Sequence, residues 1–447
     1  MKRAVKTPIC DFVRDYAARN GARMHMPGHK GLGPLGVEAL DITEISGADE
    51  LYRARGIIRE SEDNAARLFG AARTLYSAEG SSLCIRAMLY LALTDARRRG
   101  LPARLLAARN AHKTLMTAAA LLDTDVRWLF SGSLLQCRVT PEALDAAILR
   151  EAPTAVYVTS PDYLGHTLDI AALAAVCHRR GLPLLVDNAH GAYLRFLPDD
   201  RHPITLGADL CCDSAHKTLP CLTGAAYLHI GGGAPACFFD QAEQALALFA
   251  STSPSYLILQ SLDAANAALA GDFRPALARC VQRVAGIRQR LADHGYALTG
   301  DEPMKLTLRP KGYGYTGDAL HGLLRASDIE CEFSDPDHLV LMPAPQTPEA
   351  DLDRVEEALL RIPRRPALPD APPPLPRPER VCSIRQAMLS PQTEAPVSQA
   401  LGRVLADAHM GCPPAVPILA AGERIDEAAL QCFRYYGWEN CRIVNNE

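Results

Sequence analysis

The stretch Asp213-Ser214-Ala215-His216-Lys217-Thr218-Leu219-Pro220 decides how the chain is interpreted. It follows the apolar run Ala208–Cys212, which has the length and composition of a short buried strand. A lysine at the end of such a strand is costly to bury, and one way to relieve the cost is a Schiff base between its amine and an aldehyde. The alternative is a lysine that extends to the surface at the strand end.

The composition is that of an ordinary globular protein. Of 447 residues, 48% are hydrophobic and 22% are charged, and the formal net charge of -4 favours neither a nucleic-acid nor a membrane partner. No run of roughly 18 residues is apolar throughout, as a membrane span would be, and the start offers no apolar core of a signal peptide. The 14 cysteines lack a Cys-x-x-Cys repeat and predict reduced core thiols, with no metal site. We therefore expect a cytoplasmic protein.

Predicted strands and helices alternate through the first half of the chain. The predicted strands are 75–78, 104–108, 126–130, 155–159, 183–186, 210–212 and 225–230. The predicted helices are 60–69, 79–99, 113–122, 140–150 and 169–181, after an amphipathic helix within the first twenty residues. This alternation predicts an α/β fold with a mainly parallel sheet, whose ligand lies beyond the carboxyl ends of the strands.

The pattern changes beyond residue 271. A long helix, the predicted strands 306–308, 329–333 and 339–342, and a helix over 351–361 indicate a smaller α+β domain. A proline-rich stretch follows and is typical of a semi-rigid linker. We expect an N-terminal arm (1–40), a large α/β domain (41–270), a small α+β domain (271–362), a linker (363–380) and a C-terminal segment (381–447).

Polar residues follow several predicted strands and are expected at one edge of the sheet. Asp187 and His190 follow one strand, Lys217 follows another, and His112 follows a third. The turn Gly80-Ser81-Ser82 joins a strand to a helix, so its backbone N–H groups and hydroxyls form a cradle for a phosphate. Helix capping is the alternative for these serines.

A cofactor with an aldehyde, a phosphate and a basic ring nitrogen would use every member of this set, and pyridoxal phosphate is such a cofactor. Lys217 would form the Schiff base, and Asp187 would pair with the protonated ring nitrogen, which makes the ring an electron sink. His112 could stack on the ring. The phosphate would be held by Gly80, Ser81 and Ser82, helped by Ser214 and His216.

Segments along nearly the whole chain resemble the pyridoxal-phosphate-dependent Orn/Lys/Arg decarboxylases of aminotransferase-like fold (fold type I), in their short bacterial form. The resembling segments are 25–31, 41–44, 56–70, 109–113, 187–192, 214–219, 252–256 and 413–417 with Gly422 and Glu423. The resemblance implies decarboxylation of arginine, lysine or ornithine to the corresponding amine, a reaction of polyamine metabolism.

The resemblance also implies roles for single residues. Segment 187–192 matches the ring-aspartate segment and brings Ala189 to the cofactor. Segment 252–256 implies that Ser253 reaches the phosphate of a neighbouring subunit, so a homodimer or higher homo-oligomer would share its sites. Glu423 is the candidate for the distal cation of the substrate.

The acid that protonates the product stays open between His190, His216 and Lys217. Several positions depart from the family pattern and bear on the substrate and the extent of activity: Glu79, Ile85, Asn188, Tyr193 and Gly224. Two alternatives therefore stand beside decarboxylation. One is another reaction of the same fold, aminotransfer or β-elimination, and the other is a cofactor-binding regulatory homologue with little turnover.

Overall fold

The computed structural model describes residues 5–19, 21–130, 132–407 and 416–445. The chain divides into two compact units, of which the first comprises 1–105, 140–160 and 169–276, and the second 106–139, 161–168 and 277–447. The five-part division expected from the sequence stays a prediction.

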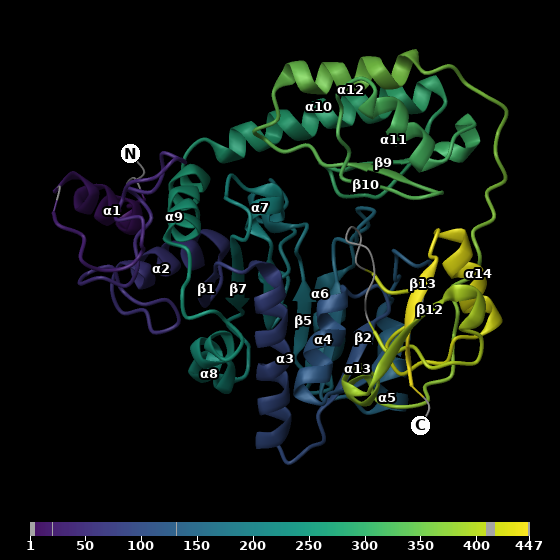
Figure 1. The fold of residues 1–447 in the computed structure, drawn as a ribbon, viewed down its shortest axis with the longest axis horizontal. Coiled ribbons are helices and arrows are strands. Elements are labelled where there is room, and N and C mark those ends of the chain that lie inside the picture. The colour runs from purple at the N-terminus through teal and green to yellow at the C-terminus, as the bar shows by residue number, and fades with distance from the viewer. Residues whose placement is uncertain (1–4, 20, 131, 408–415, 446–447) are drawn as a thin grey trace. The chain divides into compact units, whose positions relative to one another are not determined.

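The first unit holds the elements around the predicted lysine (Figure 1). Its helices are α1 (Pro8–Ala18), α2 (Ile57–Phe69), α3 (Gly80–Arg98), α5 (Pro141–Glu151), α6 (Ile170–Arg179), η1 (Ala192–Phe196), α7 (Ala215–Thr218), α8 (Ala236–Ala247) and α9 (Tyr256–Ala270). Its strands are β1 (Arg73–Ser77), β4 (Ala155–Thr159), β5 (Leu184–Asp187), β6 (Leu210–Asp213) and β7 (Ala226–Ile230).

The sheet of this unit has the strand order β1-β7-β6-β5-β4. β4 and β5 are parallel, as are β5 and β6, whereas β7 is antiparallel to both β6 and β1. Four strands therefore run in one direction and only β7 opposes them. The predicted mainly parallel sheet is confirmed, with β7 as its antiparallel strand.

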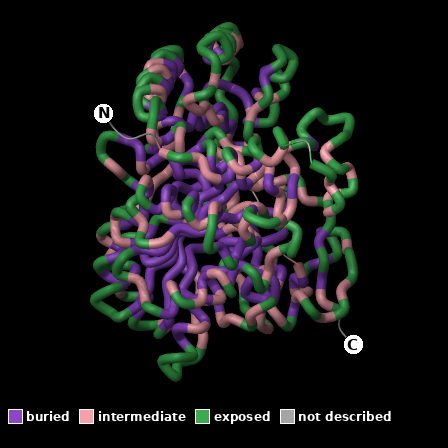
Figure 2. The backbone as a smooth tube through the Cα atoms, turned by 90° about the vertical axis from the view of Figure 1, so that its left-hand side faces the viewer, coloured by how far each residue is buried: buried purple, intermediate pink, exposed green. Residues whose placement is uncertain are grey.

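The strands form where apolar and β-branched residues are continuous. β5, β6 and β7 are buried at every position, as expected for strands covered on both faces. Figure 2 draws the buried stretches of the chain in purple. Helix α2 ends at Gly70, which adopts φ 73°, a left-handed conformation that glycine reaches without a Cβ clash. Such local signals explain why most predicted boundaries lie within a few residues of the observed ones.

Helices α1, α2 and α9 pack against one another (Figure 1). The buried carboxylate of Asp263, on α9, accepts the backbone N–H groups of Ile9 and Cys10, both at 2.9 Å. These donors belong to the first turn of α1, where a helix has no internal partner for its N–H groups. Asp263 therefore fastens the N-terminal helix.

The second unit includes the chain from residue 277 onward. β2 (Arg104–Ala108) and α10 (Phe273–His294) begin in the first unit and continue into the second. The other helices are α4 (Lys113–Leu122), η2 (Pro310–Tyr313), α11 (Gly317–Arg325), α12 (Glu349–Arg361), α13 (Ile384–Leu389), η3 (Val397–Gln399) and α14 (Glu427–Tyr435). The other strands are β3 (Asp125–Leu129), β8 (Ala297–Thr299), β9 (Leu306–Arg309), β10 (Phe333–Ser334), β11 (Leu339–Leu341), β12 (Gln392–Pro396) and β13 (Asn440–Val444).

Two small antiparallel sheets lie in this unit. One has the order β10-β11-β9-β8, and the other pairs β12 with β13. The predicted strand 329–333 is wrong for most of its length, because only Phe333 and Ser334 pair with β11. Among the described residues, no helix combines the length and the apolar character needed to cross a bilayer.

Candidate active site

The predicted site lies at the carboxyl ends of β5 and β6. Asp187, the last residue of β5, is paired in register with Cys212 of β6. β6 ends at Asp213, and the chain turns through Ser214 into the short helix α7, which carries Lys217. Because the two strands are parallel, their ends bring Asp187 and the Lys217 segment to the same edge of the sheet.

The amine of Lys217 contacts an imidazole. Lys217 Nζ lies 3.0 Å from Nε2 of His190. His190 is buried in a turn that is closed by the bond from Gly191 N–H to the carbonyl of Asn188, at 2.8 Å. An imidazole at this distance can accept a proton from the ammonium, which the amine must lose before it attacks an aldehyde.

The carboxylate of Asp187 is buried and held from two sides. Tyr157 O–H donates to Oδ2 at 3.0 Å, and the buried Ala189 donates its N–H to Oδ1 at 3.1 Å. Burial, and after it the neighbouring carboxylate, raises the pKa of Tyr157 well above its usual value. The phenol therefore stays protonated, and it remains a donor that orients Asp187.

The residues predicted to hold a phosphate, Gly80, Ser81 and Ser82, lie at the start of α3. Ser214 Oγ donates to Ser81 Oγ at 2.8 Å, which joins the cradle to the lysine segment. Gly80 has φ 71°, and no atom lies within 4 Å of the place where a Cβ would stand. Ser82, half-buried, is the next residue of the helix. The side of Gly80 thus offers open space beside two linked hydroxyls.

Gly224 is one of the positions that depart from the family pattern, and the structure gives a reason for a glycine there. Its carbonyl accepts the N–H of Gly80 at 2.7 Å. Gly224 adopts φ 95°, and a Cβ would meet Ala78 O and Ile258 Cδ1 at 3.1 Å. Any side chain here would be strained and crowded, so the glycine lets this backbone support the cradle.

His216 stands beside Lys217 on α7 and is half-buried. Its Nδ1 lies 3.0 Å from the carbonyl of Ala225. Burial lowers the pKa of His216 and outweighs that hydrogen bond. The ring is therefore neutral near pH 7, with its proton on Nδ1 and an acceptor at Nε2.

His112 and Glu423 belong to the second unit. His112 is the N-cap of α4, where Nδ1 accepts the N–H of Thr114 at 3.2 Å. Glu423 is buried and forms an ion pair with Arg109, with Nη2 and Oε2 3.2 Å apart. The same carboxylate oxygen accepts the N–H of Ala420 at 2.6 Å. The structure thus gives each residue a local partner, and their ligand roles stay predictions.

Ser253 is exposed in the loop before α9. Its N–H donates to Ser251 Oγ at 3.1 Å, and Ser251 N–H donates to the carboxylate of Glu79 at 2.7 Å. Glu79 is the N-cap residue of α3. This loop therefore lies beside the cradle of its own chain. Of the predicted pocket loop 413–417, residues 413–415 lie outside the described residues.

Comparison with known families decides the assignment. A family model described as Orn/Lys/Arg decarboxylase, major domain, matches residues 7–346, more than half of the chain. The chain belongs to the Orn/Lys/Arg decarboxylase family. The resemblance and the predicted class of reaction, decarboxylation of a basic amino acid, are thereby confirmed.

Individual relatives extend over almost all of the decarboxylase. An arginine decarboxylase of Bacillus subtilis (strain 168) is 30% identical over 469 residues, which cover 94% of this chain and 92% of that protein. An arginine decarboxylase of Halalkalibacterium halodurans is 29% identical over 487 residues, covering 97% and 94%. A solved lysine decarboxylase of Francisella novicida superposes with a TM-score of 0.80 at 16% identity, over 99% of this chain and 81% of that one. This last likeness confirms the predicted fold class.

The first unit of the decarboxylase suits pyridoxal phosphate. Three buried polar atoms beside the predicted cofactor residues have no hydrogen-bond partner among the described residues: Thr159 Oγ1, Asn188 Oδ1 and Thr218 Oγ1. Thr159 pairs in register with Asp187, and Thr218 follows Lys217. Unpaired buried polar atoms are costly. Together with the amine, the carboxylate and the serine hydroxyls, they form a donor and acceptor set that a polar, phosphorylated aldehyde would satisfy.

Two residues around the site were missed by sequence reasoning. Tyr157, which orients Asp187, sits within a continuous apolar strand and carries no motif signal. Asp213, the first residue of the opening stretch, was given no role, although it is fully buried with two histidines at hydrogen-bond distance. A charged residue ending an otherwise apolar strand was the available signal.

Proposed function

We propose that the decarboxylase acts on arginine, with pyridoxal phosphate bound covalently to Lys217. The observation that carries the covalent role is the contact of Lys217 Nζ with the buried His190. Lys217 follows β6, and His190 lies in the turn after Asp187, which ends the neighbouring strand β5. The choice of arginine is supported by the two relatives named arginine decarboxylase.

The residues around Lys217 would each bind a different part of the cofactor. When bound, pyridoxal phosphate supplies a ring that takes up the electrons of the broken bond between Cα and the carboxylate. Asp187, held by Tyr157 and by the Ala189 backbone, would present a negative charge to the ring nitrogen of the cofactor. The hydroxyls of Ser81, Ser82 and Ser214 would hold the phosphate, with Gly80 leaving room for it. Stacking of His112 on the ring stays a prediction.

The proton is handled by the contact between Lys217 and His190. His190 takes the proton that Lys217 loses, and either group can later return one to Cα of the product. His216, whose Nδ1 is engaged by Ala225, is the third candidate acid. Of these, the Lys217–His190 pair has the direct contact that proton transfer needs.

Glu423 is the proposed partner of the distal cation of the substrate, and Arg109 already compensates its charge. The carboxylate of Glu423 is therefore expected both to bind the substrate and to stabilise the second unit. The cytoplasmic location and a part in polyamine metabolism stay predictions.

A homodimer with shared sites is part of the proposal. Its support is the N-terminal arm, where five large apolar side chains are exposed within a short segment: Met24 (90%), Met26 (68%), Leu32 (80%), Leu35 (79%) and Val37 (40%). Such a concentration of exposed apolar side chains is typical of a protein interface. The exposed Ser253 would then meet the neighbouring subunit.

A substrate screen tests the proposed function. The protein loaded with pyridoxal phosphate is incubated with arginine, lysine and ornithine, and CO2 and amine are measured for each. We expect the highest kcat/KM with arginine. A preference for lysine or ornithine would reject the substrate, keto-acid formation would indicate aminotransfer, and no product from any of the three would favour the regulatory homologue.

A further inference from the structure

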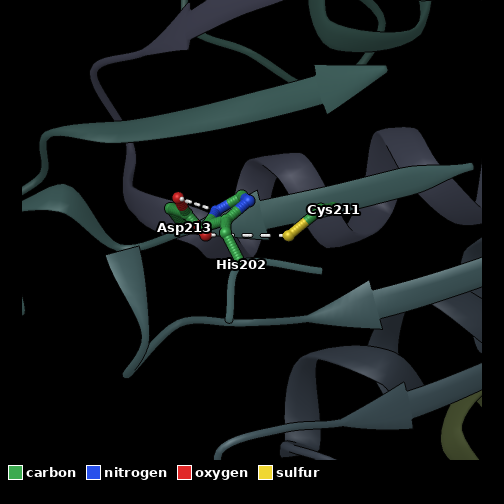
Figure 3. A group of neighbouring side chains, drawn as sticks. All are labelled: His202, Cys211 and Asp213. Atoms are coloured by element: carbon green, nitrogen blue, oxygen red, sulfur yellow. Dashed lines mark hydrogen bonds and ion pairs between the residues drawn. The ribbon is translucent and has the colours of Figure 1, made fainter. Parts of the chain in front are cut away.

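A fully buried carboxylate lies four residues before Lys217, at the end of β6. Asp213 Oδ2 accepts hydrogen bonds from His202 Nε2 at 2.9 Å and from His229 Nε2 at 3.2 Å. The thiol of Cys211 lies 3.7 Å from Oδ1 (Figure 3). None of these side chains takes part in the chemistry proposed above.

The carboxylate of Asp213 is charged. Burial by itself would raise its pKa, but the two histidines outweigh burial and hold the pKa well below its usual range. Burial lowers the pKa of His229, so that imidazole acts as a neutral donor near pH 7. A buried charge supported by hydrogen bonds holds its partners firmly, because losing a partner would leave the charge unsatisfied.

The other oxygen of this carboxylate reaches the segment of the site. Asn188 Nδ2 donates to Asp213 Oδ1 at 2.7 Å. Asn188 directly follows Asp187, and its N–H donates to Cys212 O at 3.0 Å. Its carbonyl closes the turn 188–191, which carries His190. A single side chain therefore lies at the junction between Asp187 and His190.

Asp213 also begins the segment on the lysine side. The next residue, Ser214, accepts the N–H of Lys217 on its carbonyl at 3.0 Å, and its hydroxyl contacts Ser81. Asp213 therefore links the turn that carries His190 to the start of the segment that carries Lys217. The relative position of this turn and this segment sets the distance between the Lys217 amine and the His190 imidazole.

We propose that Asp213 is a positioning residue of the decarboxylase. Its charge, held by His202 and His229, fastens Asn188 and so sets the place of Asp187 and the contact between His190 and Lys217. This inference rests on the proposed function of those residues. It also accounts for Asn188, which stands where the family commonly has an acid, because a second carboxylate there would lie against Asp213.

The same group has the spacing of a metal site. Donor atoms of His202, Cys211 and Asp213 all lie within 4.8 Å of one another. In the structure, however, Asp213 is already the acceptor of four side-chain hydrogen bonds, from Asn188, Cys211, His202 and His229. Metal analysis of the purified protein is therefore part of the test, and one equivalent of metal lost in His202→Ala would overturn the proposal.

The test exchanges the amide and the carboxylate. The variants are Asp213→Asn, Asn188→Asp and the double variant with both changes, each purified and loaded with pyridoxal phosphate. Asp213→Asn removes the charge, and Asn188→Asp places two carboxylates in contact. We expect each single variant to bind the cofactor about tenfold more weakly, as for a lost charge-assisted hydrogen bond. The double variant restores the pair and is expected to return to within about threefold of wild type.

Asp209→Asn is the matched control. Asp209 is also a buried carboxylate just before β6, with His178 Nε2 at 2.9 Å and Leu184 N–H at 2.8 Å, but at the opposite end of the strand from Lys217. It is expected to lower thermal stability and to leave cofactor affinity and KM unchanged. A purely structural role for Asp213 predicts the same behaviour for Asp213→Asn.

Amide hydrogen exchange gives a readout that needs neither cofactor nor turnover. We expect exchange in the peptide covering 188–191 to be about tenfold faster in Asp213→Asn, as expected when a hydrogen bond to a charged group is lost, and to recover in the double variant. Unchanged exchange and unchanged cofactor affinity in Asp213→Asn would overturn the proposal, as would a double variant no better than the worse single one. Wild-type protein that binds no pyridoxal phosphate at Lys217, with the exchange pattern as expected, would reject the proposed function and leave Asp213 as the anchor of this turn.

Discussion

Arg109 and Glu423 form a buried ion pair within the second unit, with Nη2 and Oε2 3.2 Å apart and side-chain exposures of 2% and 6%. Arg109 also donates to the carbonyls of Pro417 and Ile418, at 3.3 and 3.0 Å. Burial raises the pKa of Glu423 and lowers the pKa of Arg109, each against the effect of its partner. Desolvation therefore offsets much of the attraction within the pair.

Removing one member of this pair should cost more stability than removing both. Glu423→Gln leaves the guanidinium uncompensated and is expected to lower the free energy of unfolding by about 3–5 kcal/mol. The double variant Arg109→Met, Glu423→Leu is expected to lose less of the free energy of unfolding. Denaturant unfolding of both variants under the same conditions measures the difference. A Glu423→Gln variant with wild-type stability and a raised KM for arginine would assign the carboxylate to the substrate alone.

His190 should control how fast Lys217 reacts. His190→Ala removes the acceptor 3.0 Å from the amine, so formation of the adduct with pyridoxal phosphate is expected to slow by about 10²–10⁴-fold. The rate follows from the visible absorbance of the adduct, trapped with borohydride and mapped to Lys217. His178→Ala, at a half-exposed histidine paired with Asp209, is the control. Equal rates in His190→Ala and wild type would remove His190 from the proton path.

The buried carboxyl of Glu62 gives a pH prediction. Burial raises its pKa from an ordinary value of 4.5 to about 8, and its Oε1 accepts the N–H of Tyr76 at 2.9 Å. The folded protein therefore binds this proton more tightly than the unfolded chain does. The contribution of Glu62 to stability is present below pH 4.5 and is lost as the pH rises to about 8.

Glu62→Gln keeps the acceptor without the titration. Within that window, the stability of the variant relative to wild type should rise by up to about 1.4 kcal/mol per pH unit. Above the window, this difference should stay constant. Unfolding curves at several pH values measure the difference. A difference independent of pH would show that Glu62 does not titrate in the folded protein.

Shared sites predict rescue in hybrid dimers. Lys217→Ala and Ser253→Ala subunits, each of low activity, are mixed after mild dissociation. If Ser253 serves the partner subunit, a hybrid contains one site with both residues intact, and activity is partly restored. The contact between Ser251 and Glu79 within one chain makes self-contained sites the opposing outcome, in which every mixture stays as inactive as its parts.

The sheet of the first unit could be predicted because its signals are local. β4 was predicted as 155–159 and observed as Ala155–Thr159, since a buried apolar run bounded by polar residues leaves little choice of register. The strand predicted over 329–333 was wrong for most of its length because pairing depends on the neighbouring strand. β11 pairs only with Phe333 and Ser334. Strand length in a small antiparallel sheet is decided by the neighbour.

That three of the predicted residues lie at one edge of the sheet could be predicted, but the contacts around them could not. Asp187, His190 and Lys217 follow strand ends, and parallel strands bring such ends together. The hydrogen bonds of Asp213 join positions far apart in the sequence, namely Asn188, His202 and His229. Likewise, the ion pair of Glu423 with Arg109 depends on how the second unit folds, which no local pattern encodes.

The measurement that tests the central claim most directly uses arginine labelled in its carboxyl carbon. The loaded wild-type protein is predicted to release labelled CO2 and the corresponding amine in equal amounts, and Lys217→Ala, treated identically, is predicted to release neither. Keto acid in place of amine, no product from wild type, or undiminished CO2 release by Lys217→Ala would contradict the claim.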